Sequence, residues 1–329
     1  MAHYALLAEH FAAVFYPYRN RAGPNNAPDS SVVSSDHIIA YSFANDAFFR
    51  TDYYFTQGMT LNVVLPVLAK SPVNKILLGS KMVAVRYHGV KVFYDGFTPL
   101  RIQDAFIRVG DRPYASYIYA SLYRVANQPQ RRQRLTAGID VGFMGPAAGA
   151  KGFQTKVHEL LDAPTPRGWD YQVQNDLVLG YQLGFEKQLL GGKFAELIGT
   201  ARASVGTLNT LAATGLLLRM GKMNPYFRNL GVSSAAGRAG GQKFQLYAQG
   251  RLEGRAVGYN ATMQGGILNR QSPYTLRAEQ LKRTVVQGSG GVLLAYGGLR
   301  FEPSATWVSP EFRGGRAHRW VQFEVWGAF

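Results

Sequence analysis

The chain has 329 residues, of which 47% are hydrophobic, 13% aromatic and only 17% charged, with 37 glycines and no cysteine. The lack of cysteine excludes disulfides, thiolate nucleophiles and cysteine-based metal sites, and the aromatic, glycine-rich composition is typical of a β-rich protein. A formal net charge of +16 indicates an anionic partner: nucleic acid, an anionic membrane surface or a phosphorylated substrate.

The first part of the chain is predicted to lie outside the main domain. Residues 1–16, "MAHYALLAEHFAAVFY", form an apolar stretch without the preceding Lys or Arg and the cleavage site of a signal peptide. Either the signal peptide is missing from this numbering or the segment is an amphipathic extra. Residues 19–36 are rich in Gly, Pro, Asn and Ser and predict a linker. We expect an N-terminal extension over residues 1–35 and one domain over 36–329.

From residue 37 onward the sequence alternates with period two. In "HIIAYSFAN" the bulky residues Ile39, Tyr41 and Phe43 alternate with small ones, and "RLTAGIDVGF" and "FQLYAQGRLEG" repeat the pattern with polar residues on the second face. Segments of about ten residues with one apolar face are typical of membrane-barrel strands. A transmembrane helix is not expected, because no run of about eighteen apolar residues occurs.

Twelve segments carry this strand signal, and an even number suits a single-chain bacterial barrel. They lie near residues 36–46, 55–69, 80–95, 114–126, 131–144, 173–188, 195–208, 210–221, 242–253, 254–267, 283–302 and 315–329. The last strand, "RWVQFEVWGAF", ends the chain on an aromatic residue and resembles the outer-membrane assembly signal. We predict an all-β fold: a transmembrane antiparallel β-barrel of about 12 strands with a short helix packed outside the wall.

One segment, "GPAAGAKGFQTKVHELLDAPTPRGW", predicts that helix. It carries Phe153, Val157 and Leu160 at helical spacing and is stopped by prolines. Gln154 and His158 lie four residues apart and therefore on one face. "HELL" imitates a zinc-protease motif, but the second histidine of that motif is missing, which argues against such an enzyme.

Asn45 and Asp46 end the first strand and have two readings. Both residue types favour turns. Asn45, however, continues the outward face of Tyr41 and Phe43, where an unsatisfied amide would cost several kcal/mol in hydrocarbon. A helix outside the wall could supply its partner. Asn45 and Asp46 point to opposite faces of a regular strand, so the strand must twist, bulge or end if both serve one site.

Six separated blocks resemble the lipid A 3'-O-deacylase family of Gram-negative outer membranes. They occur in family order and span Phe43 to Gly315: "FANDAFFRTDYYFTQG", "DRPYAS", "GFMGPAAGAKGFQTKVHELL", "RGWDYQ", "EGRAVGYNA" and "SPEFRGG". The resemblance implies a twelve-stranded outer-membrane barrel and a calcium-dependent hydrolase that removes the 3'-linked acyl or acyloxyacyl chain of lipid A. Its site is expected between the outer wall and the short helix.

The resemblance also implies the site residues. Its catalytic set corresponds to Asn45, Asp46, Thr56, Gln154 and His158, with His158 as the general base that activates water. Asn45 and Asp46 would be ligands of the calcium ion, which prefers oxygen donors. Thr56 falls on the even face of its strand, opposite in parity to Asn45, which leaves the local strand pairing open.

Basic residues near "GDRPY" are the candidates for substrate binding: Arg101, Arg108 and Arg112. Between Arg101 and Arg108 the sequence does not choose which one assists the oxyanion. The segment after the helix departs from the family pattern at Pro164 and Pro166, so no role is carried over to those positions.

The expected partners are lipid A and the outer membrane, with the chain acting as a monomer. A nucleic-acid partner is not expected, because the charges are dispersed, with residues 131–134, "RRQR", as the only dense run, and no nucleic-acid motif accompanies them. Two alternatives remain open: a porin-like or structural barrel without catalysis, and a soluble β-sandwich that binds an acidic partner.

Overall fold

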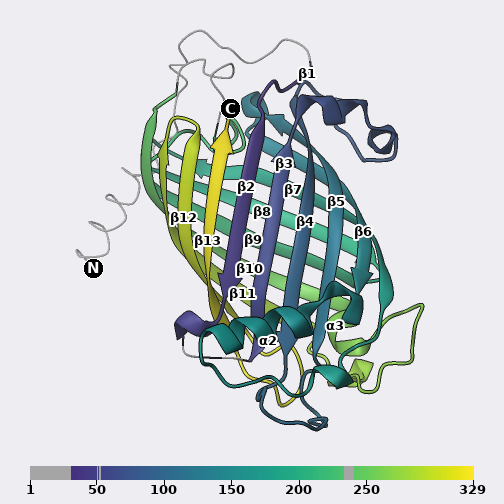
Figure 1. Cartoon of the computed structure of the whole chain (residues 1–329). Coiled ribbons are helices and arrows are strands. Elements are labelled where there is room, and N and C mark those ends of the chain that lie inside the picture. The colour runs from purple at the N-terminus through teal and green to yellow at the C-terminus, as the bar shows by residue number, and fades with distance from the viewer. Residues whose placement is uncertain (1–30, 50, 52, 233–240) are drawn as a thin grey trace, which may run out of the picture.

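The computed structural model describes residues 31–49, 51, 53–232 and 241–329. Strands β2 to β13 each pair antiparallel with their neighbours in the chain, and β13 also pairs with β2, which closes a twelve-stranded barrel (Figure 1). The short strand β1 (Val32–Val33) adds to the start of β4 in parallel. The predicted extension over residues 1–35 lies mostly outside the described residues.

Apart from β2, with 8 residues, the barrel strands are long enough to cross a bilayer when tilted. They are β2 (Ile38–Asn45), β3 (Tyr54–Val64), β4 (Val85–Thr98), β5 (Ala115–Gln128), β6 (Gln133–Met144), β7 (Asp176–Gly191), β8 (Ala195–Gly206), β9 (Asn209–Lys222), β10 (Phe244–Asn260), β11 (Thr284–Tyr296), β12 (Leu299–Val308) and β13 (His318–Ala328). Two helices accompany them, α2 (Ala150–Leu160) and α3 (Ala261–Gln264). Short 3₁₀ helices lie at Ala47–Phe49, Pro66–Lys70, Pro72–Lys75, Pro129–Arg131, Pro146–Ala148, Trp169–Tyr171 and Ala278–Gln280.

The predicted barrel of twelve strands is confirmed, but two boundaries between its predicted strands are wrong. One strand was divided into two segments and two strands were merged into one, so the total number of strands is unchanged. Segments 242–253 and 254–267 share the single strand β10, which pairs along most of its length with β9 and β11 and is followed by α3. Segment 283–302 instead contains strand β11 and the first residues of β12. A tight turn separates them at Gly297, whose φ of +60° is the left-handed conformation that glycine adopts easily.

The apolar face of the alternating pattern points outward, as predicted. On β2, Ile38 and Ala40 are buried, whereas Ile39 and Tyr41 are each 47% exposed. An outward apolar band against a polar interior is the pattern of a membrane barrel. In the part of the chain that the structure describes, no helix combines the length and apolarity needed to cross a bilayer.

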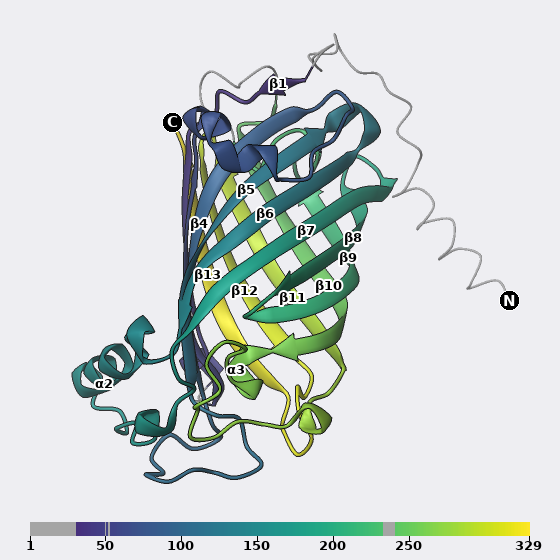
Figure 2. The same ribbon diagram turned by 90° about the vertical axis from the view of Figure 1, so that its right-hand side faces the viewer.

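The barrel has two different rims. We call the rim that holds the start of β2 and the end of β13 the terminal rim, and the opposite one the loop rim. The loop rim carries the long connection 145–175 with α2, and Figure 2 shows this helix outside the barrel wall. In barrels of this class the longer loops lie on the extracellular side and the shorter turns on the periplasmic side, which assigns the loop rim to the cell exterior.

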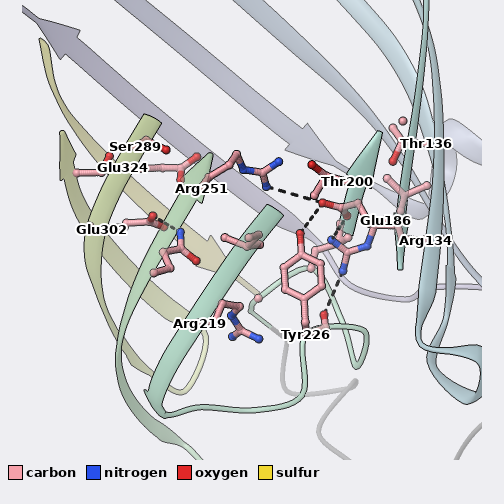
Figure 3. A pocket seen from close by; sticks show the side chains of 18 of the residues that line it. Arg134, Thr136, Glu186, Thr200, Arg219, Tyr226, Arg251, Ser289, Glu302 and Glu324 are labelled. Carbon is pink, nitrogen blue, oxygen red and sulfur yellow. Dashed lines mark hydrogen bonds and ion pairs between the residues drawn. The ribbon is translucent and has the colours of Figure 1, made fainter. Parts of the chain in front are cut away.

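A segment of the β9–β10 connection fills the lumen near the terminal rim. Arg134 of β6 donates to the carbonyl oxygens of Tyr226 (3.2 Å) and Asn229 (2.8 Å), and the Tyr226 hydroxyl donates to Glu186 (2.8 Å). Phe227 is 3% exposed and packs on the wall. A cavity of about 600 Å³ remains beside this segment, lined by charged side chains (Figure 3).

This filled lumen predicts a poor channel. In planar bilayers the protein should show no stable porin-like conductance, because Tyr226 and its partners obstruct the lumen. The double change Arg134→Ala and Tyr226→Ala removes the bonds that hold the segment and should increase conductance. The outward Tyr296, 67% exposed, gives the control Tyr296→Ala, and large conductance in the wild type would contradict an obstructed lumen.

Candidate functional site

The outer wall at the loop rim is polar where β2 ends. Asn45 is the last residue of β2, and its Nδ2 donates to the Thr56 carbonyl on β3 over 2.8 Å. Its Oδ1 accepts the N–H of Ala47 over 2.7 Å, which turns the chain into the 3₁₀ helix Ala47–Phe49. The partner of the outward Asn45 amide is therefore the neighbouring strand and its own turn, and not the helix that the sequence suggested.

A β-bulge on β3 turns Thr56 outward. The β3–β4 register passes from Phe55 opposite Phe97 to Gln57 opposite Gly96, so that Thr56 is the extra residue. Phe55 points into the lumen, with Phe55 lining the same inner cavity as Phe97. The bulge explains how Thr56, on the even and inward face of a regular strand, reaches the outer wall beside Asn45.

Asp46 lies just beyond the end of the strand ladder. Its side chain is buried, with the residue 3% exposed, and its Oδ2 accepts the backbone N–H of Tyr53 over 3.0 Å. The Asp46 carbonyl accepts the Thr51 hydroxyl over 3.2 Å. Because β2 ends at Asn45, the alternation of a regular strand no longer forces Asp46 toward the lumen.

Helix α2 is fixed to this wall by a chain of buried hydrogen bonds. Gln154 is 1% exposed and its Nε2 donates to the Thr56 hydroxyl over 3.1 Å. Its Oε1 accepts Nε1–H of Trp169, also 1% exposed, over 2.7 Å. Trp169, Gln154, Thr56 and Asn45 thus form one hydrogen-bonded series from the segment after α2 to the end of β2.

The face that α2 turns to the barrel is small and polar. Ala150 and Gln154 are its buried residues, whereas Leu160 is 85% exposed and Phe153 is 39% exposed. Phe153 also meets the outward ring of Tyr94, with centroids 6.0 Å apart. The apolar stripe read from the sequence therefore points away from most of the wall, as expected for a helix whose other side meets lipid.

His158 follows Gln154 by one helical turn and is half-buried. Its Nδ1 lies 2.7 Å from the carbonyl oxygen of Pro164. Because a carbonyl can only accept, Nδ1 carries the proton in this contact, and Nε2 is the basic nitrogen of the neutral ring. Pro164, for which the family pattern offered no role, thus selects the histidine tautomer through its backbone.

The three arginines predicted for substrate binding are placed differently. The Arg101 side chain is 65% exposed, with its Nε 4.0 Å from Asp104. Arg108 hydrogen-bonds to Asp104 and, over 3.2 Å, to Asp111. The bond to Asp104 raises the pKa of Arg108, burial acts in the opposite direction, and the bond to Asp111 raises it further. Of these three arginines, only Arg101 is exposed enough to meet a ligand without first breaking a close ion pair.

Arg112 lies inside the barrel mouth, and not at the outer wall where we expected it to bind substrate. Arg112 is 2% exposed and donates to Glu311 (2.7 Å) and Thr262 (2.8 Å), with its guanidinium 4.2 Å from the Phe97 ring centroid. Burial acts to raise the pKa of Glu311, but the charges of Arg112 and His318 outweigh it and lower the pKa. Arg112 thus joins the β4–β5 connection to α3 and to the β12–β13 connection across the barrel mouth.

The oxygen atoms at the end of β2 suit a hard cation in chemical type. They are the Asn45 amide oxygen and the Asp46 carboxylate, and Ca²⁺ prefers such ligands in sets of six to eight. Across residues 31–329, apart from the undescribed positions, no group of three or more acidic or histidine side chains is arranged so that it could hold a metal ion by itself. The remaining ligands of a calcium ion would be backbone carbonyls, water or substrate oxygens.

Comparison with known protein families shows to which family this barrel belongs. The family model described as "Outer membrane protein LpxR" matches residues 11–329. The chain belongs to the LpxR family. Its localisation in the bacterial outer membrane, predicted from the strand pattern, is thereby confirmed.

One solved structure of an LpxR protein shares this fold, and a second solved barrel is less similar. The structure of LpxR from Salmonella typhimurium covers 89% of this chain and is itself covered completely, with a TM-score of 0.68 at 17% identity. The β-domain of the Bordetella autotransporter BrkA covers 90% of this chain, and 99% of it is covered, with a TM-score of 0.44 at 10% identity. The comparison with curated protein sequences gives no match.

Two residues of the site region were not assigned a role from the sequence of this LpxR-family chain. Trp169, in the block "RGWDYQ", donates to Gln154. Gln57, 3% exposed, donates to the Tyr94 hydroxyl over 3.1 Å beneath α2. The "RGWDYQ" block was a signal for Trp169, but only the fold shows which side chain it meets.

The Trp169–Gln154 bond predicts a specific loss of stability. Trp169→Phe keeps an aromatic ring and leaves the buried Gln154 oxygen unpaired, which costs about 1–3 kcal/mol. We expect faster hydrogen exchange across residues 150–160 and a lower thermal midpoint in detergent. Trp307, 44% exposed on the outer wall, gives the control Trp307→Phe. Equal protection of α2 in both variants would contradict the role of this bond.

Proposed function

We propose that this LpxR-family barrel is a calcium-dependent hydrolase that removes the 3'-linked acyl or acyloxyacyl chain of lipid A. The observation that carries the proposal is the hydrogen bond from Gln154 to Thr56. It holds α2 against the outer wall and sets His158, one turn further, on the side of the barrel that faces lipid. A buried lumen site would be closed to an acyl chain, whereas this site opens toward the membrane.

The position along the membrane axis also supports a lipid A substrate. Lipid A occupies the outer leaflet of the outer membrane, and the loop rim with α2 lies at the extracellular end. The exposed apolar side chains of α2, Phe153 and Leu160, would contact acyl chains. Arg101 is the arginine best placed to meet an anionic group of the lipid, because its side chain is 65% exposed.

His158 would act as the general base. With its Nδ1–H held by Pro164, Nε2 takes a proton from water as the water oxygen bonds to the ester carbonyl carbon. When the ester C–O bond breaks, the protonated ring returns that proton to the departing sugar oxygen. Thr56 and Gln154 keep the helix in the position from which His158 can do this.

Asn45 and Asp46 would hold the calcium ion through their side-chain oxygens. A bound calcium ion would supply positive charge that polarises the ester carbonyl and stabilises the developing oxyanion. The hydrogen bonds of Asn45 to Thr56 and Ala47 fix the direction of its amide oxygen. Wall, helix and candidate ligands all come from one chain, which supports action as a monomer, and the obstructed lumen disfavours a porin.

The role of His158 is tested by His158→Ala. Loss of a general base lowers the rate by roughly 10²–10⁴-fold, and the barrel should stay folded because His158 is not among the buried residues of α2. Mass spectrometry of lipid A from cells that express each variant measures the loss of acyl chains. His37, exposed at the terminal rim, gives the control His37→Ala. Undiminished deacylation by His158→Ala would refute the mechanism.

The calcium requirement is tested by chelation and by Asp46→Asn. Chelation should stop deacylation by the purified protein, and added Ca²⁺ should restore it better than the smaller Mg²⁺. Asp46→Asn keeps the shape but removes one charge, so the Ca²⁺ concentration for half-maximal activity should rise at least about tenfold. Asp162→Asn, on the exposed turn after α2, serves as the control. Full activity of the wild type in excess chelator would exclude the proposed cofactor.

A further inference from the structure

The terminal rim carries a basic surface that the proposed hydrolase does not use. The β3–β4 connection, residues 65–84, reads "LPVLAKSPVNKILLGSKMVA" and contains three lysines and no acidic residue. We call this connection the flap. Lys70, Lys75 and Lys81 are all exposed, and within the described residues none of them forms an ion pair.

The flap lies on the outside of the barrel wall. Tyr123 lines the lumen, so its neighbour Arg124 on β5 points outward, where it donates to the carbonyl of Leu77. Two strands further along the wall, the outward Tyr181 accepts the N–H of Leu78 over 2.7 Å. Figure 2 shows this connection crossing the outer surface near the terminal rim. The flap is thus fixed across several strands at the height where the wall meets one membrane surface.

Polar side chains of the wall are covered by the flap, while its own apolar side chains point away. His88 is 5% exposed, and its Nδ1 lies 2.8 Å from Asn74 Oδ1. Val67, Ile76 and Leu78 are 59%, 65% and 52% exposed. A segment that combines exposed apolar residues with lysines is suited to the membrane interface, since the apolar groups enter the acyl boundary and the lysines reach headgroups.

Neighbouring turns of the same rim extend the positive charge. Arg131 and Arg132 end the turn into β6, and Arg131 is exposed. Lys193 is exposed in the β7–β8 turn, 5.1 Å from the Phe194 ring centroid. The nearby Glu186 and Glu196 point into the lumen, where arginines bind them. The outward charge of the rim is therefore not neutralised by them.

We propose that the flap, with the turns beside it, binds the anionic headgroups of phospholipids in the periplasmic leaflet. Lysines near a membrane surface attract anionic lipids with about 1 kcal/mol each. The lipid A substrate is not the occupant, because the 14-residue strand β4 separates the flap from the loop rim by roughly 45 Å along the strand. The proposal depends on the barrel orientation and not on deacylation, so either proposal can fail alone.

Native mass spectrometry of the full chain tests the flap directly. The protein is equilibrated in detergent with equal amounts of phosphatidylglycerol and phosphatidylethanolamine, and the retained lipids are counted. The wild type should retain phosphatidylglycerol preferentially. The triple change Lys70→Gln, Lys75→Gln and Lys81→Gln should lower that preference about tenfold or more.

The matched control removes three positive charges from the loop rim: Arg270→Gln, Lys282→Gln and Arg313→Gln, all at exposed positions. It should keep the preference for phosphatidylglycerol. If the flap variant does not fold, the wild type alone still decides, because about 1 M salt, with a Debye length near 3 Å, should abolish the preference. Equal retention of the two lipids by the wild type, or an unchanged preference in the folded flap variant, would overturn the proposal.

Discussion

The hydrogen bond between Gln154 and Thr56 is the interaction on which the candidate site depends. Both residues are almost fully buried, and the bond joins a helix to the outside of a wall that otherwise faces hydrocarbon. The bond satisfies a polar group of each side chain at a place where an unsatisfied polar group would cost several kcal/mol. The β-bulge that turns Thr56 outward and the helix that carries Gln154 are therefore coupled through this hydrogen bond.

This coupling also explains the reversed character of α2. A helix on a soluble protein packs its apolar stripe on the core and exposes its polar face. On α2 this order is reversed, since Ala150 and Gln154 pack on the wall while Leu160 is exposed, which suits a helix whose far side meets lipid. His158 lies next along the polar side of α2, where the proposed function requires an ester bond of a membrane lipid to approach it.

The sequence predicts the barrel well because strand alternation is local. The apolar Ile39 and Tyr41 indicate the outward face of β2 from that strand's sequence alone. It fails where the outcome depends on pairing. The bulge at Thr56 exists only relative to the register with β4, and the inward direction of Arg112 depends on Glu311, 199 residues away. The six family blocks supplied the candidate residues of the site, but their order along the chain could not show that Trp169 bonds to Gln154, or that Pro164 selects the tautomer of His158.

The charges behind the net charge of +16 lie in separate parts of the molecule, and each part has to be considered by itself. Inside the barrel, arginines pair with acidic residues, as in Arg219 with Glu196 (2.6 Å) and Arg202 with Glu253 (2.7 Å). These paired charges stabilise and obstruct the lumen but add little to the net electrostatic field of the protein. The unmatched lysines of the flap lie on the outer surface at the terminal rim. A field at that rim falls off within about 10 Å at moderate ionic strength, so it cannot draw substrate to α2 at the opposite rim. Whatever attracts lipid A must be built into the loop rim itself, where Arg101 is exposed, and the basic balance of the whole chain is not evidence for substrate binding.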